Sequence, residues 1–142
     1  AAKNRAQESG DESSAIQLSD GTMITAGSSP LLGTCASLLL NSIKHLAGID
    51  HSVKLISQDF IEPIQKTKVD YLGGNNPRLH MDEVLVALSV LSLNDVNCRR
   101  ALAMLPELNG LQAHATVMLS QVDQKILKKL GISLACDPAS KK

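Results

Sequence analysis

The chain is 142 residues long and 44% of these are hydrophobic, which is enough to build the core of one domain. With one Tyr, one Phe and no Trp, it lacks the aromatic side chains on which readers of single-stranded nucleic acid stack bases. Its 14 basic and 14 acidic residues cancel. No net charge therefore draws the protein to nucleic acid or to an acidic membrane surface, and neither is expected as a partner.

The N-terminal part predicts a polar entry followed by a β-hairpin. Residues 1–14 are polar and charged, which is typical of a linker or a frayed end. Two short β-prone runs, 15–18 and 22–25, flank Ser19-Asp20-Gly21. An Asp-Gly pair between such runs is a strong hairpin signal.

A helix is expected next, over about 31–47, because apolar residues recur there at helical spacing. Ser29 is a natural N-cap, Pro30 suits the first helical position, and Gly48 would be the C-cap. Ser28 and Ser29 would then lie between a strand and a helix. Free amides and hydroxyls at such a turn can bind an anion, although an ordinary N-cap is the simpler interpretation.

The middle of the chain predicts one strand and two helices. Residues 53–57 form a short β-prone run, and a helix is expected over 59–70. Pro63 falls inside that stretch, so the helix either starts near Pro63 or is kinked there. Residues 82–93 are apolar nearly all round, which predicts a deeply buried helix.

The C-terminal third alternates helices and strands. A helix over about 95–105 stops at Pro106, and 112–119 is predicted to be a central strand because both of its faces are mostly apolar. A capping-box-like pattern at 120–123 opens a helix that ends at Gly131, before a last strand over 132–136.

This order predicts an α/β fold with a single domain over 15–138 and a solvated tail over 139–142. One hairpin followed by strands alternating with helices favours a mixed sheet with helices on both faces, a three-layer α-β-α sandwich. The order is that of cytidine-deaminase-like folds. A Rossmann-like sheet is the alternative, but its glycine fingerprint is missing, since Gly27 to Gly33 has the wrong spacing.

Cys35, Cys98 and Cys136 are far apart in the sequence and odd in number. They form neither a C-x-x-C motif nor a zinc-finger spacing, so we expect three reduced thiols, mostly buried, in a cytoplasmic protein. The sequence predicts no membrane span, signal peptide or cofactor. It begins in a polar segment without an initiator Met, so we expect it to be part of a longer chain.

The densest group of chemically able side chains lies in 71–83, at a predicted helix-to-helix junction. Gly73-Gly74 would let a ligand approach the backbone, with Asn75 and Asn76 beside it. Arg78 could hold a phosphate or carboxylate through two hydrogen bonds. The structural interpretation is that the glycines end one helix and Asn76-Pro77 forms a turn.

Three residues are candidates for acid–base chemistry. His80 and Glu83 lie near the predicted N-terminus of a helix, where a histidine can act as a general base. The alternative is that Asp82 and Glu83 simply complement the helix dipole. His114 lies in a predicted strand between two alanines, where a satisfied core histidine is the simpler reading.

Several separated motifs, in the right order, resemble the C-terminal part of an uncharacterised bacterial family, the domain of unknown function eighteen-forty-six. The resemblance covers nearly all of 15–137. It is carried by Ile61-Glu62-Pro63-Ile64-Gln65-Lys66, Tyr71-Leu72-Gly73, Asn75-Asn76-Pro77-Arg78-Leu79-His80, Asp82-Glu83-Val84-Leu85, Leu105-Pro106-Glu107-Leu108, Ala113-His114, Met118-Leu119-Ser120 and Lys128-Lys129-Leu130-Gly131-Ile132. The resemblance implies a longer cytoplasmic protein, a deaminase-like α/β fold and no established activity.

Zinc deamination is not expected. Zinc deaminases place His-x-Glu or Cys-x-Glu at the start of the helix after the hairpin, and Pro-Cys-x-x-Cys at the start of the next helix. Here these places read Ser28-Ser29-Pro30-Leu31 and Ser57-Gln58-Asp59-Phe60, without a thiolate or an imidazole. No metal site is therefore predicted.

Two hypotheses remain. In the first, the chain is a structural or regulatory C-terminal domain of a larger bacterial protein, or an oligomer interface. In the second, it is part of an enzyme for a small anionic, nucleotide- or phosphate-like ligand, and Arg78, His80 and Glu83 line one cleft with Ser28 and Ser29. Geometry separates them, because residues that only cap helices and close loops do not form such a cleft.

Overall fold

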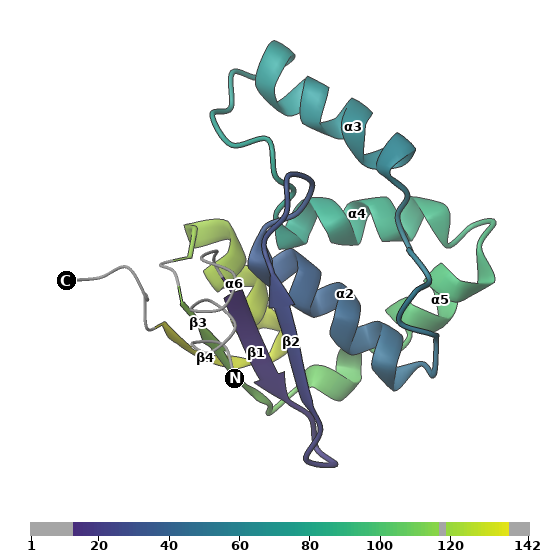
Figure 1. Ribbon diagram of the computed structural model, residues 1–142, viewed down its shortest axis with the longest axis vertical. Helices are drawn as coiled ribbons and strands as arrows, with labels where there is room; N and C mark the ends of the chain where they lie inside the picture. The colour runs from purple at the N-terminus through teal and green to yellow at the C-terminus, as the bar shows by residue number, and fades with distance from the viewer. Residues whose placement is uncertain (1–12, 117–118, 137–142) are drawn as a thin grey trace.

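The computed structural model describes residues 13–116 and 119–136 (Figure 1). Two segments expected to be solvated, the entry up to residue 12 and the tail over 139–142, lie outside the described residues. The described part is an α/β fold with one four-stranded mixed sheet.

The sheet has the strand order β2-β1-β3-β4. Strand β1 pairs antiparallel with β2 and with β3, and β3 pairs parallel with β4. The strands span Ser13–Gln17, Met23–Gly27, Gln112–Ala115 and Ser133–Cys136. The predicted hairpin of β1 and β2 is confirmed, and its turn has Gly21 at φ +92 and the Asp20 carboxylate accepting a hydrogen bond from the Thr22 amide.

Six named helical segments lie between β2 and β4, together with one π-helical segment. In chain order they are α2 (Thr34–Leu46), α3 (Gln58–Lys66), the π-helical η1 (Thr67–Tyr71), α4 (Met81–Leu91), α5 (Val96–Leu102), the 3-10 helix η2 (Leu105–Leu108) and α6 (Gln121–Leu130). Figure 1 shows α3 as the outermost helix, next to α4 and away from the sheet.

The helices α2, α4 and α6 share a core with one face of the sheet. Ile16, Ala113 and Leu134 are register partners on this face, and the core that they line includes Leu38 of α2 and Leu127 of α6. Since successive residues of a strand point to opposite faces, the sheet carries its core on this side.

The opposite face of the sheet is polar and open in the described residues. Gln17, Gln112, His114 and Ser133 are exposed there. The expectation of helices on both faces therefore differs from the described part, where α2, α4 and α6 cover one face. Strand β3 is interior in the sheet, as predicted, but the prediction that both of its faces are mostly apolar is wrong.

The helix predicted over 31–47 begins later, at Thr34. The Ser29 hydroxyl accepts hydrogen bonds from the amides of Leu31 and Leu32, so it closes a turn before the helix instead of capping it. Gly33 is the N-cap residue. At the other end Gly48 adopts φ +72 directly after the C-cap, as expected of a helix-ending glycine.

The strand predicted over 53–57 is wrong, because this segment is a loop. No strand lies beside it, and the Lys44 ammonium takes up the carbonyls of His51 and Val53 at 2.9 and 2.8 Å. The apolar character of the run reflects packing, since Leu55 and Ile56 are buried in the core.

The following helix begins at Gln58, well before Pro63, and continues as a π-helix over Thr67–Tyr71. Helix α4 starts one residue before its predicted start, but it is not buried all round. Its inner residues are buried, whereas Val86 and Val90 are 66% and 53% exposed. The prediction of a deeply buried helix is therefore wrong for this outer face.

Candidate functional site

The 71–83 junction is closed by one cation, Lys68 of η1. Its ammonium donates to the Arg78 carbonyl at 2.7 Å and to the Glu83 carboxylate at 2.9 Å. It also lies 3.5 Å from His80 Nδ1. The side chains of Lys68 and Glu83 are only 14% and 25% exposed, so water screens this pair less than it screens a surface pair. We call this arrangement the Lys68 clamp.

His80 and Glu83 build the start of α4. His80 is the N-cap residue, and its backbone amide donates to the Glu83 carboxylate at 2.8 Å. The imidazole lies 3.6 Å from the same carboxylate oxygen. One carboxylate oxygen thus serves the helix cap and the Lys68 clamp together.

Asn75, Asn76 and Arg78 lie in the loop before α4. The Asn76 side chain accepts a hydrogen bond from the Arg78 amide at 3.0 Å, which is a local turn contact. Asn75 and Asn76 are exposed and Arg78 is partly buried. Gly73, at φ +74, ends the preceding helical segment in the left-handed conformation that favours glycine.

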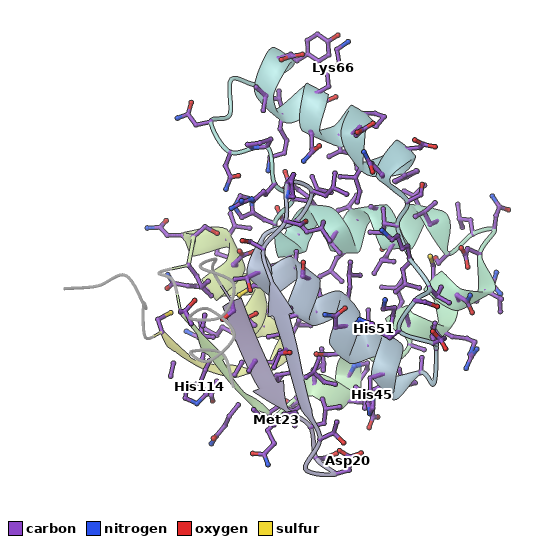
Figure 2. All side chains as sticks on the ribbon, viewed as in Figure 1. Asp20, Met23, His45, His51, Lys66 and His114 are labelled. Atoms are coloured by element: carbon purple, nitrogen blue, oxygen red, sulfur yellow. The ribbon has the colours of Figure 1, made fainter. Side chains whose placement is uncertain are left out.

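The structure brings the Ser28-Ser29 turn next to this junction. The Leu79 amide donates to the Leu31 carbonyl at 2.9 Å, and the Gly33 amide donates to the Leu79 carbonyl at 3.1 Å. This isolated parallel bridge ties the loop before α2 to the loop before α4. Leu79 between them is fully buried. His114 is not part of this group, because it lies on the open face of the sheet (Figure 2).

Asp123 joins α6 to the same place. Its carboxylate accepts a hydrogen bond from the Met81 amide at 3.0 Å, and its own amide donates to the Ser120 hydroxyl. Asp123 is 6% exposed. Burial, assisted by the negative charge of Asp82, raises the pKa of this carboxyl above its usual range.

Sequence reasoning missed Lys68 and assigned Asp123 only a place in a capping pattern. Both make their decisive contacts with residues distant in the sequence, Glu83 and Met81 respectively. The available signal was weak, because a lysine on a predicted helix is usually a solvated residue.

A second polar group lies at the C-terminal end of α2. Asn41, Lys44, His45 and His51 line a hollow of about 240 Å³, and Figure 2 shows His45 and His51 there as neighbours. Both histidines are exposed, as expected. The Lys44 ammonium holds two loop carbonyls, and burial lowers its pKa. The group therefore fixes the loop after α2.

Metal ligation and thiol chemistry find little support in the described residues. No group of three or more His, Cys, Asp or Glu side chains is placed there so as to hold a metal ion. The three cysteines are free, Cys35 and Cys98 are buried, and Cys136 is exposed. No helix in the described ranges is long and apolar enough to cross a membrane.

These features define a small mixed α/β domain in which clustered polar side chains hold helix termini and loops. The chain belongs to the family described as domain of unknown function DUF1846, C-terminal, whose model matches residues 1–142. This agrees with the resemblance seen in its sequence motifs.

Bacterial proteins named UPF0371 are similar to it. The chain is 51% identical over 137 residues to one from Corynebacterium aurimucosum, and these cover 96% of this chain and 28% of that protein. It is 43% identical over 138 residues to one from Streptococcus thermophilus, with coverage of 97% and 28%. The chain thus spans about 28% of the length of these curated relatives.

Proposed function

We propose that this chain is a structural C-terminal domain of a longer bacterial cytoplasmic protein, and that it supports a site formed mainly elsewhere in that protein. The Lys68 clamp carries the proposal. The charged groups of the junction bind one another and the loop backbone, an arrangement that stabilises a fold. The length of the curated relatives supports the longer parent protein.

We infer that the rest of that protein covers the open face of the sheet. A sheet covered on both faces would be the three-layer sandwich expected of a deaminase-like fold. The open face carries His114 at the centre of interior strand β3, with Ala15 and Ala135 as its register partners. Ala15 and Ala135 are small, so another layer could approach closely there.

Thiol labelling tests this proposal. His114→Cys, made together with Cys136→Ser, places one reactive thiol on the open face. Lys54→Cys in the same background is the control, because Lys54 is exposed in the loop before α3. In the longer protein, maleimide should label position 114 at least about tenfold more slowly than in the 142-residue chain, while position 54 keeps its rate. Equal rates at position 114 would rule the covered face out.

A second candidate function is the binding of a small anionic ligand, nucleotide- or phosphate-like, by part of an enzyme. The bridge between the Leu31 and Leu79 segments favours it, because it sets the Ser28-Ser29 turn beside the loop of Arg78. Asn75, Asn76 and Arg78 would bind the anion in this arrangement, and His80 or Glu83 would serve as the acid–base group.

A thermal-shift screen with inorganic phosphate, sugar phosphates and nucleotides tests the second candidate. Stabilisation by one of them should disappear in Arg78→Ala and persist in Arg99→Ala, an exposed arginine of α5. If none of them stabilises the chain, or if Arg78→Ala keeps the whole shift, the junction binds no such anion.

A further inference from the structure

An apolar groove separates α3 from α4. It encloses about 460 Å³ and is lined by Phe60, Pro63 and Ile64 of α3 and by Val86, Ala87 and Val90 of α4. Three acidic residues, Asp59, Asp82 and Glu83, also line it. We call it the α3–α4 groove.

The amphipathicity of the two helices explains why the groove is open. Helix α4 is apolar on two sides and buries only the inner one, through residues such as Val84 and Leu88. Ile61 is the one buried residue of α3, so this helix is held to the body mainly at its ends. One of these contacts is the Gln65 side-chain amide, which donates to the Pro30 carbonyl at 2.9 Å.

An exposed apolar surface of this kind needs an explanation. Val86 is 66% exposed, and at the end of η1 Tyr71 and Leu72 are 72% and 75% exposed. Burying apolar surface is worth about 25 cal/mol per Å². Contiguous apolar patches on a soluble protein usually mark an interface.

We propose that the α3–α4 groove binds an amphipathic helix from the part of the longer protein that precedes this domain. This proposal rests on the proposed function of a domain within a longer chain. The match is to a C-terminal family model and covers 28% of the relatives, so most of a relative's chain precedes the matched region. That portion is always present at high effective concentration, which favours it over a free partner.

The chemistry of the groove sets the chemistry of the occupant. Two helices with facing apolar sides accept a third helix whose anchors recur every three or four residues. Asp59 and Asp82 lie at the groove with no compensating lysine or arginine among its lining residues. The occupant should therefore place Lys or Arg beside its apolar stripe.

Labelling at Val86 tests the groove separately from the sheet face. Val86→Cys with Cys136→Ser is compared with Lys54→Cys in the same background, in the 142-residue chain and in the longer protein. We expect both positions to react readily in the short chain. In the longer protein, position 86 should react at least about tenfold more slowly, and position 54 should be unchanged.

The outcomes are distinct. Equal rates at position 86 in both proteins overturn the groove proposal, and protection at position 114 in that same protein would leave the proposed function standing. Protection of position 86 in the short chain that grows with protein concentration assigns the groove to a second copy, and so overturns the proposal too.

The charge of the occupant has its own control. Adding Asp59→Lys to the Val86→Cys variant should raise the labelling rate in the longer protein at low ionic strength. Glu62→Lys is the matched change, since Glu62 lies on α3 but does not line the groove. Equal effects of the two changes would contradict a basic occupant.

Discussion

The ammonium of Lys68 lies 2.9 Å from the carboxylate of Glu83, which is 15 residues later in the sequence. Through this pair the π-helical end of the α3 segment is fastened to the first turn of α4. The loop between them therefore has a fixed exit, although Asn75 and Asn76 within it are exposed.

Lys68→Met should destabilise the domain. The change removes the donor to the Arg78 carbonyl and leaves a partly buried Glu83 carboxylate without its cation. We expect a loss of about 1 to 2 kcal/mol in the free energy of unfolding, measured with urea. Lys66→Met, at an exposed position on α3, should change it by less than about 0.5 kcal/mol. Equal losses would show that the clamp has no special role.

Asp123→Asn should alter how stability depends on pH. Because burial raises the pKa of Asp123, the folded protein binds this proton more readily than the unfolded chain does. The contribution of Asp123 to the free energy of unfolding is thus largest below the ordinary value of 3.8 and falls as pH rises through the folded pKa.

The asparagine keeps an oxygen that can accept from the Met81 amide but carries no charge. The stability of the variant relative to the original should therefore increase from acidic to neutral pH, by an amount on the order of 1 kcal/mol. Urea unfolding at several pH values measures it, with Asp59→Asn at the surface of α3 as a control for lost charge. A difference independent of pH would contradict the assignment.

Cys136 should be the one fast thiol of the native protein. Burial, followed by the nearby charge of Asp95, raises the pKa of Cys98 to about 11, and its thiol donates to the Leu55 carbonyl. Cys35 is also buried. At about pH 8, a thiol reagent should modify one cysteine rapidly in native protein and three after denaturation. Fast labelling that survives in Cys136→Ser would contradict the described burial.

Gly131→Ala should destabilise the domain more than Gly110→Ala. Both glycines have left-handed backbones, at φ +82 and +87. An added Cβ would meet nothing within 4 Å at Gly110, but at Gly131 it would come within 1.9 Å of the Asn109 side-chain oxygen. The conformational cost is about 1 to 2 kcal/mol for each. Urea unfolding should show a further loss at Gly131, of about 1 kcal/mol or more; equal losses would mean that Asn109 moves aside freely.

Local signals in the sequence were sufficient for some elements. The Asp-Gly turn predicts the β1–β2 hairpin because its geometry depends on neighbouring residues alone. The capping pattern before α6 and Gly131 after it likewise predict that helix from local chemistry, and Ser120 accepts from Asp123 as expected.

Tertiary context decided the remainder. Residues 53–57 have the composition of a strand, but no neighbouring strand is available, and Lys44 satisfies the loop instead. The outer face of α4 is apolar yet uncovered in the described residues, so hydrophobicity alone could not reveal its exposure.

The candidate site divides in the same way. His80 and Glu83, three residues apart, were predictable as the start of a helix, because a capping contact follows from spacing. The contacts of Lys68 with Glu83 and of Asp123 with Met81 join different elements. Their formation depends on how the helices pack, which spacing in the sequence does not specify.

A double-mutant cycle on Lys68 and Glu83 tests most directly the claim that the junction is structural. The free energy of unfolding is measured for Lys68→Met, Glu83→Gln and the double variant, with Lys66→Met and Glu83→Gln as the control pair. The account predicts a coupling of about 1 kcal/mol between Lys68 and Glu83, and additivity in the control pair. Additivity within about 0.3 kcal/mol for Lys68 and Glu83 as well would contradict it.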